Sequence, residues 1–423
     1  MPHDSHYMRK DLILNIVHHL GSVSRTGLID LTGYRPASVS EIIRELLDEK
    51  LLVEGGSRSV GHGRRRIMLE MNNSFLCAIA ISFYPNAVTY LVSQIDGTVL
   101  YEKEDPIGLS HSRSALAEAI TKQIAFLLEQ FQDRMIVGIG ISIPIRDPFG
   151  SLACHTLLGN YAHFSDWIRL ELKPHLEQTF DLFVGTYNGV TLPAVAEHRF
   201  GVAKGIQNFI CIELSNGIGA SIFSNGMPVT GYRGFAGELG HTVIHSGDVP
   251  QPLCYCGKPG CVEATTSFSY LTKQLTDALD RNVFSTLGDQ YEPGTPLSVD
   301  AIRTALDSGD QMSRYYVAQI AQHLGVAIAN AINLLNPELI VLHGMMLELG
   351  DYFLDALTRA IHENVLSIMD TFEIRTSFST EALRPLGAVA EVFSSYLHSD
   401  DYKWVYTLQP GDLDDGNEAD DPA

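Results

Sequence analysis

Three cysteines within eight residues constrain the local fold of this 423-residue chain more than any other feature: Cys254, Cys256 and Cys261. His241 precedes them by thirteen residues. Three thiolates and one imidazole complete the tetrahedral shell that Zn²⁺ prefers. Because all four ligands come from protein, no position stays open for a water, which favours one structural zinc ion per chain over a hydrolytic one. His245 is a competing imidazole, and reduced thiols without an ion are the alternative.

Charge and hydropathy restrict where the protein works and what it binds. The N-terminus has no apolar signal segment, and no apolar run approaches the roughly 20 residues of a membrane helix. We therefore expect a cytoplasmic protein with no membrane partner, in which clustered cysteines indicate metal rather than disulfides. The net charge of −21 disfavours a nucleic-acid partner for the chain as a whole. Residues 1–70 differ, because ten Lys and Arg residues there balance nine Asp and Glu residues.

The pattern of residues 1–72 predicts a winged helix-turn-helix domain. A first amphipathic helix is indicated by apolar residues at helical spacing, namely Leu12, Ile13, Ile16, Val17 and Leu20. Ser24 is placed to cap a second helix that runs to Thr32, Gly33 supplies the turn, and Pro36 opens a third helix. The buried face of that third helix is expected to consist of Val39, Ile42, Ile43, Leu46 and Leu47.

The outer face of the third helix and the segment after it predict contact with double-stranded operator DNA. Small or basic residues face outward there and suit the major groove: Arg35, Ala37, Ser38, Ser40 and Arg44. A strand at 51–53, a glycine-rich hairpin tip at 55–63 and a strand at 67–71 would form a wing. Its basic residues, Arg64, Arg65 and Arg66, suit phosphate or minor-groove contact. A small helical interaction domain with a charged loop is the alternative.

The remaining sequence predicts an α/β body in two lobes. Buried strands are expected at 76–83, 88–92, 98–101, 135–143, 182–186, 209–214, 220–223 and 339–342. Amphipathic helices are expected at 113–130 and around 317–332, with hairpin turns at Asp96-Gly97 and Asn225-Gly226. The end of the chain, 405–423, is acidic, with six acids and no base from Gly411 onward, and is expected to be disordered.

The stretch Gly237-Glu238-Leu239-Gly240-His241, followed by the cysteine cluster and Glu263, resembles the signature of the ROK family of repressors and sugar kinases. The resemblance spans nearly the whole chain and implies a winged helix-turn-helix joined to a two-lobed, actin-like (ribonuclease-H-like) fold. The implied domains are 1–72 for DNA binding, 73–187 with helix 385–398 for the first lobe, and 188–384 for the second lobe with the zinc loop and dimerisation surface.

The residues that carry catalysis in the family's kinases are missing. Those kinases have an Asp-x-Gly-Gly-Thr phosphate loop where this chain reads Ile81-Ser82-Phe83-Tyr84-Pro85-Asn86. Their general base is the Asp of Asn-Asp-x-Asn, where this chain reads Asn188-Gly189-Val190-Thr191. Without a carboxylate, no group is placed to take the proton of a sugar hydroxyl. The second phosphate loop survives in part as 215–219, and the adenosine-side glycines read His343-Gly344-Met345. The chain is therefore expected not to be an enzyme.

The sugar-contacting positions are better preserved. The resemblance assigns sugar hydroxyls to Asn188, Glu238, His241 and Glu263, although these residues could instead only support the zinc loop. The interpretation that follows is a repressor that senses a sugar or sugar derivative and binds its operator as a homodimer or a dimer of dimers. A repressor gated by a partner protein is the first alternative, and an ATP-dependent sugar kinase is the second.

Overall fold

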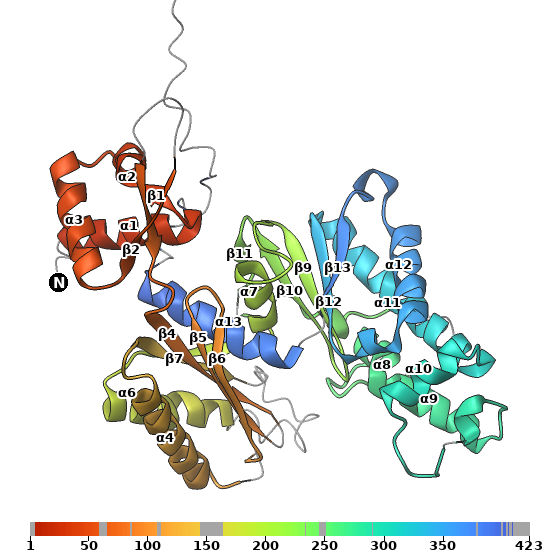
Figure 1. Cartoon of the computed structure of the whole chain (residues 1–423). Coiled ribbons are helices and arrows are strands. Elements are labelled where there is room, and N and C mark those ends of the chain that lie inside the picture. Colours follow the sequence, from red (N-terminus) through yellow and green to blue (C-terminus); the bar gives the residue numbers. More distant parts are fainter. Residues whose placement is uncertain are drawn as a thin grey trace, which may run out of the picture. The chain divides into compact units, whose positions relative to one another are not determined.

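The computed structural model describes residues 5–58, 66–84, 87–107, 111–143, 164–232, 234–244, 251–289, 291–377 and 380–398, together with positions 401, 402, 405 and 408. Contacts divide the chain into two units (Figure 1). Unit 1 contains Met1–Ile141, Leu172–Thr186 and Ala388–Ala423, and unit 2 contains Ser142–Glu171 and Tyr187–Gly387. The expected wing residues Arg64 and Arg65, the competing His245 and the acidic residues after 408 lie outside the described residues.

The N-terminal part of unit 1, the reader, consists of three helices and a three-stranded sheet. The helices are α1 (Ser5–Leu20), α2 (Arg25–Thr32) and α3 (Pro36–Asp48), and the strands β1 (Val23–Ser24), β2 (Leu52–Arg58) and β3 (Arg66–Met71) have the order β1-β3-β2. Ser24 caps α2 by accepting a hydrogen bond from the backbone N–H of Gly27, and Gly33 ends the helix with a φ of 66°. The predicted winged arrangement is confirmed by this order of elements.

The structure corrects the expected start of the hairpin tip, which the sequence placed at Gly55. Gly55 and Gly56 belong to β2, where the pairing with β3 shifts in register between Glu54 and Ser57. A Cβ atom at position 55 would lie 2.5 Å from Oε1 of Glu70, so the glycine leaves room for this carboxylate on the neighbouring strand.

The body of unit 1 is a five-stranded sheet of order β6-β5-β4-β7-β8. Its strands are β4 (Leu76–Phe83), β5 (Val88–Gln94), β6 (Val99–Asp105), β7 (Met135–Ile143) and β8 (Val184–Asn188), of which the first three form an antiparallel meander. Figure 1 shows α4 (Arg113–Gln130) and α6 (Lys173–Phe180) on the opposite side of this sheet from α13 (Thr380–Tyr396). Helix α13 lies close to β7 because Gly140 leaves room for the backbone of Ala388.

Unit 2 has a second five-stranded sheet of the same pattern, with the order β11-β10-β9-β12-β13. Strands β9 (Phe209–Leu214), β10 (Ile218–Ser224) and β11 (Met227–Pro228) are antiparallel, whereas β12 (Leu339–His343) runs parallel to both β9 and β13 (Glu373–Ser377). The longest helices here, α11 (Gln311–Leu335) and α12 (Asp351–Asn364), pack where Gly325 leaves room for Ala360. Together with α9 (Phe268–Asp280) and α10 (Val299–Asp307), they enclose a large apolar core.

The chain after α13 returns to the reader. The buried side-chain amide of Asn15, on α1, donates hydrogen bonds to the carbonyl oxygens of Asp11 and Leu397. The hydroxyl of Tyr402 donates to the carbonyl oxygen of Met8, and Val405 is fully buried. The described residues that follow α13 therefore pack with α1 in unit 1.

No helix among the described residues has the length and apolar character that crossing a bilayer requires.

Candidate metal centre and binding surfaces

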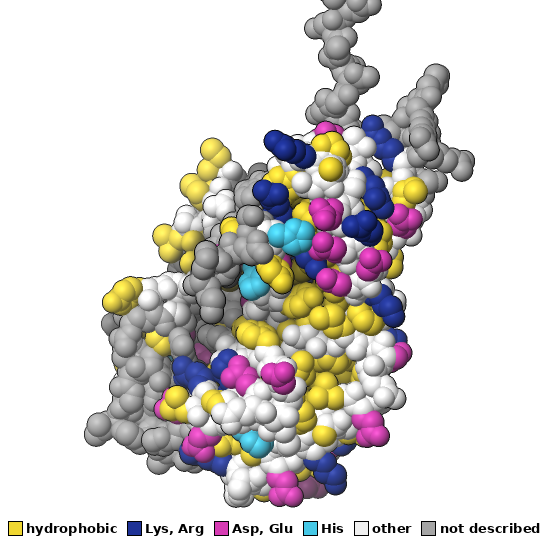
Figure 2. All heavy atoms as spheres, turned by 90° about the vertical axis from the view of Figure 1, so that its left-hand side faces the viewer, with side chains coloured by type: hydrophobic (Ala, Val, Ile, Leu, Met, Phe, Trp, Pro, Cys, Tyr) yellow, Lys and Arg dark blue, Asp and Glu magenta, His cyan; other side chains and the backbone are white. Residues whose placement is uncertain are grey.

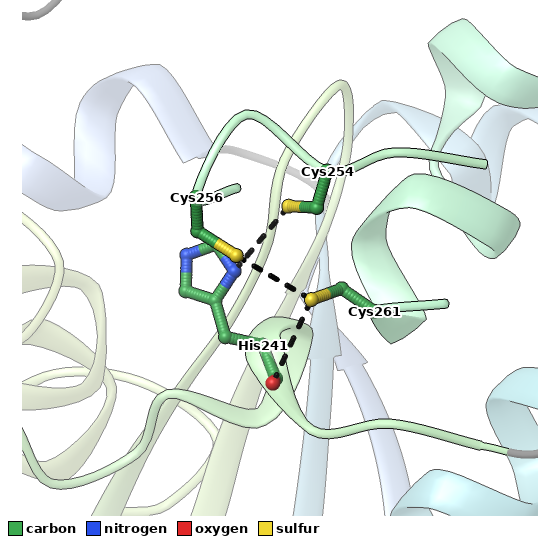
Figure 3. A group of neighbouring side chains, drawn as sticks. All are labelled: His241, Cys254, Cys256 and Cys261. Carbon is green, nitrogen blue, oxygen red and sulfur yellow. Dashed lines mark hydrogen bonds between the residues drawn. The ribbon is translucent and has the colours of Figure 1, made fainter. Parts of the chain in front are cut away.

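The predicted metal ligands come together at one point of unit 2 (Figure 3). His241 ends the short helix η3 (Leu239–His241), Cys254 and Cys256 lie in the following loop, and Cys261 directly precedes α8 (Val262–Thr266). One ligand atom from each residue lies within 4.8 Å of all the others. Cys254 Sγ is 3.6 Å from His241 Nδ1, and Cys256 Sγ is 3.5 Å from Cys261 Sγ. The cluster can therefore hold one metal ion.

The spacing and the protonation chemistry both fit a soft tetrahedral ion. Bonds of about 2.3 Å to sulfur place two thiolates of a tetrahedral shell roughly 3.8 Å apart, close to the observed sulfur separation. Burial raises the pKa of Cys254 and of Cys261. Burial acts in the same direction on Cys256, but hydrogen bonds from the backbone of Lys258 and from the neighbouring thiols bring its pKa below the ordinary value. A bound cation would stabilise all three as thiolates.

The other side of the His241 ring faces polar groups. Its Nε2 atom is 3.1 Å from the hydroxyl of Tyr255 and 3.8 Å from Oε2 of Glu238. Glu263 lies next to this group, because it interacts with Tyr255, His241 and Glu238. Its Oε2 atom also accepts a hydrogen bond of 3.0 Å from the backbone N–H of Ile218. Burial raises the pKa of Glu263, and the hydrogen bonds from Ile218 and Tyr255 partly oppose the rise. The structure thus brings together three of the four residues that were predicted to bind sugar.

Asn188, the fourth predicted residue, lies at the end of β8. Its side-chain oxygen accepts a hydrogen bond from the backbone N–H of Val190, which stabilises its own turn. That turn packs on β10, where Ser221 Oγ donates to the carbonyl oxygen of Val190. Gly237, directly before Glu238, packs on Ala220 of the same strand. Strand β10 therefore lies between the Asn188 turn and the segment that carries Glu238.

The position of the kinase base has no room for a side chain. The backbone N–H of Gly189 donates to the carbonyl oxygen of Ile143 at 3.0 Å. A Cβ atom at position 189 would lie 2.9 Å from that same oxygen and 2.9 Å from Ser142 Oγ. The local backbone is thus adapted to glycine, and a carboxylate here would require it to move.

The loops that correspond to the kinases' nucleotide-binding loops lie in both units: 81–86 in unit 1, and 215–219 and 343–345 in unit 2. At the end of β4, Ser82 and Phe83 are buried, and Pro85 and Asn86 lie outside the described residues. In unit 2, the backbone N–H of Met345 donates to Ser215 Oγ, and Gly344 has a φ of 110°. The adenosine-side and phosphate-side loops of unit 2 therefore contact each other directly.

The predicted DNA-binding residues lie on the surface of the reader. Arg35, Ala37, Ser40, Arg44 and Arg66 are exposed, and Ser38 is half-buried. Acidic residues also lie on this domain and several are paired, as in Lys10–Glu49 and Arg25–Glu54. Figure 2 shows Lys and Arg side chains interspersed with Asp and Glu on the visible face of the reader. Specific placement of the arginines, rather than a uniformly basic surface, would have to supply contact with phosphate.

Tyr255 was not singled out from the sequence, although its hydroxyl contacts two of the predicted sugar-binding residues. The only signal was its position between two cysteine ligands, which places it on the metal loop but does not say where its ring points.

Comparison with known sequences extends these observations. The model of the ROK family matches residues 81–390. The DNA-binding transcriptional dual regulator NagC of Escherichia coli is 26% identical over 371 residues, which cover 85% of this chain and 86% of that protein. The xylose repressor of Caldicellulosiruptor bescii is 26% identical and covers 93% of this chain and 98% of its own. A glucokinase of Halalkalibacterium halodurans is 30% identical, covering 72% of this chain and 86% of that enzyme.

Solved structures confirm the expected fold. A ROK family transcriptional regulator, described as a homologue of the Escherichia coli MLC protein, superposes with a TM-score of 0.74 at 24% identity. That match covers 95% of this chain and 100% of the regulator. A ROK hexokinase from Thermus thermophilus gives a TM-score of 0.60 at 22% identity, covering 77% of this chain and 99% of the enzyme. The kinase match leaves about a quarter of the present chain uncovered.

Proposed function

The chain belongs to the ROK family, and from this premise we propose that it is a sugar-responsive transcriptional repressor that binds operator DNA through its N-terminal winged helix. The observation that carries the proposal is the extent of the likeness. A repressor matches 93% of the chain, whereas a glucokinase matches 72%. A sugar-kinase-like body joined to a reader accounts for both figures.

The reader would insert α3 into the major groove. Arg35 and Arg44 are exposed at the start and on the outer face of this helix, and the wing residue Arg66 is exposed at the start of β3. Arginines contact phosphate oxygens and guanine edges, while Ala37, Ser38 and Ser40 are small enough for close approach to bases. A two-fold homodimer would present two readers to a palindromic operator.

Sugar would be sensed by Asn188, Glu238, His241 and Glu263. These are carboxylate, amide and imidazole groups, which are the side chains that recognise sugar hydroxyls. The metal cluster would hold one structural zinc ion through His241, Cys254, Cys256 and Cys261, and would thereby fix the segments that carry Glu238 and Glu263. The sugar can shift the DNA-binding equilibrium only by as much as its affinity differs between the two states of the protein.

The glucokinase likeness keeps a sugar kinase as the second candidate function. Two observations favour the non-catalytic interpretation. Gly189 stands at the place of the general base, and a Cβ atom there would meet Ile143 and Ser142. At the first phosphate loop, the Asp and the glycines are replaced by Ser82, Phe83 and their neighbours. We therefore favour a body that binds a sugar without transferring a phosphoryl group to it.

The proposed function is tested by sugar-dependent release of DNA. Fragments enriched by the full-length protein from genomic DNA of its source supply the operator, and N-acetylglucosamine, xylose and glucose are then titrated. At least one sugar should lower operator affinity. Glu238→Gln should abolish that effect while operator affinity without sugar and zinc content stay near wild type, because Glu238 is neither a DNA contact nor a metal ligand.

Two results would contradict the proposal. Equal operator binding by a chain that lacks residues 1–72 would remove the reader from DNA recognition. Unchanged operator affinity with every sugar would instead favour a repressor gated by a partner protein.

A further inference from the structure

The two nitrogens of His241 have different partners, and the difference limits what the ring can bind. Nδ1 faces the thiol of Cys254 at 3.6 Å, on the side of the metal cluster. A neutral imidazole that ligates a metal through Nδ1 carries its proton on Nε2, so this nitrogen offers a single N–H donor. The hydroxyl of Tyr255 lies 3.1 Å from Nε2 and takes that donor.

The same hydroxyl also contacts Glu263. A hydrogen bond from Tyr255 is one of the influences that lower the pKa of the Glu263 carboxyl group. The chain of donors is therefore consistent: His241 Nε2–H donates to the Tyr255 oxygen, and the Tyr255 O–H donates to Glu263. Glu238 Oε2, 3.8 Å from Nε2, lies beside this chain. The Tyr255 hydroxyl thus contacts His241 and Glu263, two of the residues assigned to the sugar. A third, Glu238, lies beside His241.

We propose that Tyr255 sets the affinity of this protein for its sugar. The Tyr255 hydroxyl occupies the position that a sugar hydroxyl would take between His241 and Glu263, and it must leave before a sugar can bind there. The inference rests on the proposed function, since it takes these two residues as sugar contacts. A sugar hydroxyl is, like a tyrosine hydroxyl, one donor and an acceptor. Nε2 cannot donate its single proton fully to both, so the tyrosine and the sugar compete.

The position of Tyr255 permits such an exchange. The residue lies in the loop between Cys254 and Cys256, and 48% of its surface is exposed. Its ring meets the His241 ring edge-on, with centroids 5.2 Å apart and an interplanar angle of 78°. Because the ring is not enclosed by the core, it can turn away without opening the apolar interior of unit 2. The metal ligands on either side would hold the loop backbone in place meanwhile.

A purely structural role makes a different prediction. Groups that bond the second nitrogen of a metal-bound histidine orient the ring, and their loss weakens metal binding about 10- to 100-fold. If orientation of His241 were the only role of Tyr255, its hydroxyl would govern zinc retention and leave sugar affinity unchanged.

The test is Tyr255→Phe in the full-length protein, which removes only the competing hydroxyl. N-acetylglucosamine, xylose and glucose are titrated with both proteins by isothermal calorimetry, and zinc loss to a chelator is followed in parallel. We expect the dissociation constant of the bound sugar to fall roughly 2- to 10-fold, the range that follows from losing one competing hydrogen bond. Tyr315→Phe is the matched control, because Tyr315 is also an exposed tyrosine of unit 2 whose oxygen accepts a hydrogen bond, from Gln319.

Each outcome decides the question. Tighter sugar binding by Tyr255→Phe alone supports the inference. Weaker binding would show that Tyr255 is itself a sugar contact, and unchanged binding with faster zinc loss would leave it a purely orienting role; both overturn the inference while the proposed function stands. If neither protein binds any of the sugars, the inference and the sugar-sensing part of the proposed function fall together.

Discussion

At the scale of single residues, Gly189 is the position that bears most directly on whether the chain could transfer a phosphoryl group. The position follows Asn188, a proposed sugar contact, and in the resembling kinases it holds the catalytic carboxylate. Here the backbone of Ile143 and the hydroxyl of Ser142 occupy the space that a Cβ atom would need. A side chain at position 189 would therefore require the neighbouring backbone to shift, and we expect that a single substitution would not supply a working base.

Gly189→Asp should accordingly fail to create a kinase. Forcing a side chain against Ile143 should lower the free energy of unfolding by about 1–3 kcal/mol, the usual cost of overpacking. Urea denaturation measures the stability, and a coupled ADP assay with ATP and the three sugars measures turnover. A stable variant with sugar-dependent ADP release would show that the backbone adapts readily and that the missing carboxylate was the only obstacle.

The cluster of His241 and the three cysteines could be predicted from the sequence because its chemistry is local. His241 and the three cysteines lie within 21 residues, and few arrangements other than metal binding gather such side chains. The contact of Tyr255 with His241 and Glu263 could not be predicted from the sequence, because any residue type can occupy a position between two cysteine ligands. Its ring direction depends on how the loop folds back on η3 and α8. The sugar-binding role of Asn188, which bonds within its own turn, stays a prediction.

At the scale of elements, the loop between η3 and α8 has little structure of its own. Its described residues form no helix or strand, only two isolated β-bridges, Val243 with Cys261 and Leu253 with Pro259, and turn hydrogen bonds such as that from the N–H of Cys254 to the carbonyl oxygen of Lys258. Its apolar side chains Val243, Leu253 and Tyr255 are exposed, so they contribute little burial to hold the loop in place. The metal would then supply most of the folding free energy of this loop.

Replacing Cys256 with Ser should therefore release zinc and loosen the loop. We expect one zinc ion per wild-type chain, less in the variant, and faster proteolytic cleavage between η3 and α8. Elemental analysis and mass spectrometry of limited digests measure both effects. Cys211→Ala is the control, because Cys211 is buried in β9 outside the cluster, so this variant should keep its zinc. Wild-type protein purified without zinc would contradict the assignment.

The elements whose boundaries are marked by local chemistry could be predicted closely. The helix expected at 113–130 is α4, which begins after Ser112, whose side chain accepts a hydrogen bond from the N–H of Ala115. The glycine-rich segment was placed wrongly because Gly55 and Gly56 belong to β2, whose pairing with β3 is a tertiary contact that glycine composition does not reveal. The π-helical turn Ile168–Leu172 likewise has no marker in the sequence.

At the scale of the whole molecule, the last helix connects unit 2 to unit 1, which contains the reader. Helix α13 begins in unit 2 and ends in unit 1, where Leu397 accepts the hydrogen bond from Asn15 of α1. Burial and the carboxylates of Glu49 and Asp11 raise the pKa of Tyr396, which places the end of α13 near both α1 and the end of α3. The expected domain boundaries treat the reader as separate, whereas contacts group it with the first sheet and the C-terminal residues.

This contact makes the reader depend on the other end of the chain. Asn15 is fully buried, and replacing it with Leu removes the donor to Leu397 and leaves that carbonyl oxygen without this bond. An unsatisfied buried polar group costs about 1–3 kcal/mol. Amide hydrogen exchange in α1 and α3 should then accelerate by roughly 10- to 100-fold, while exchange in β9 and β12 of unit 2 stays at the wild-type rate.

Asn364→Leu is the matched control for this variant. Asn364 on α12 also donates to the carbonyl oxygen four residues before it, as Asn15 does to Asp11, but it lies in unit 2. It should leave exchange in the reader unchanged. Operator affinity is the second readout, because a loosened α1 no longer holds α3 against the reader core, and Asn15→Leu should weaken binding without changing zinc content. Equal protection of α1 in the wild type and in Asn15→Leu would mean that the reader is stable without the end of α13, and that any sugar signal must reach DNA by another route.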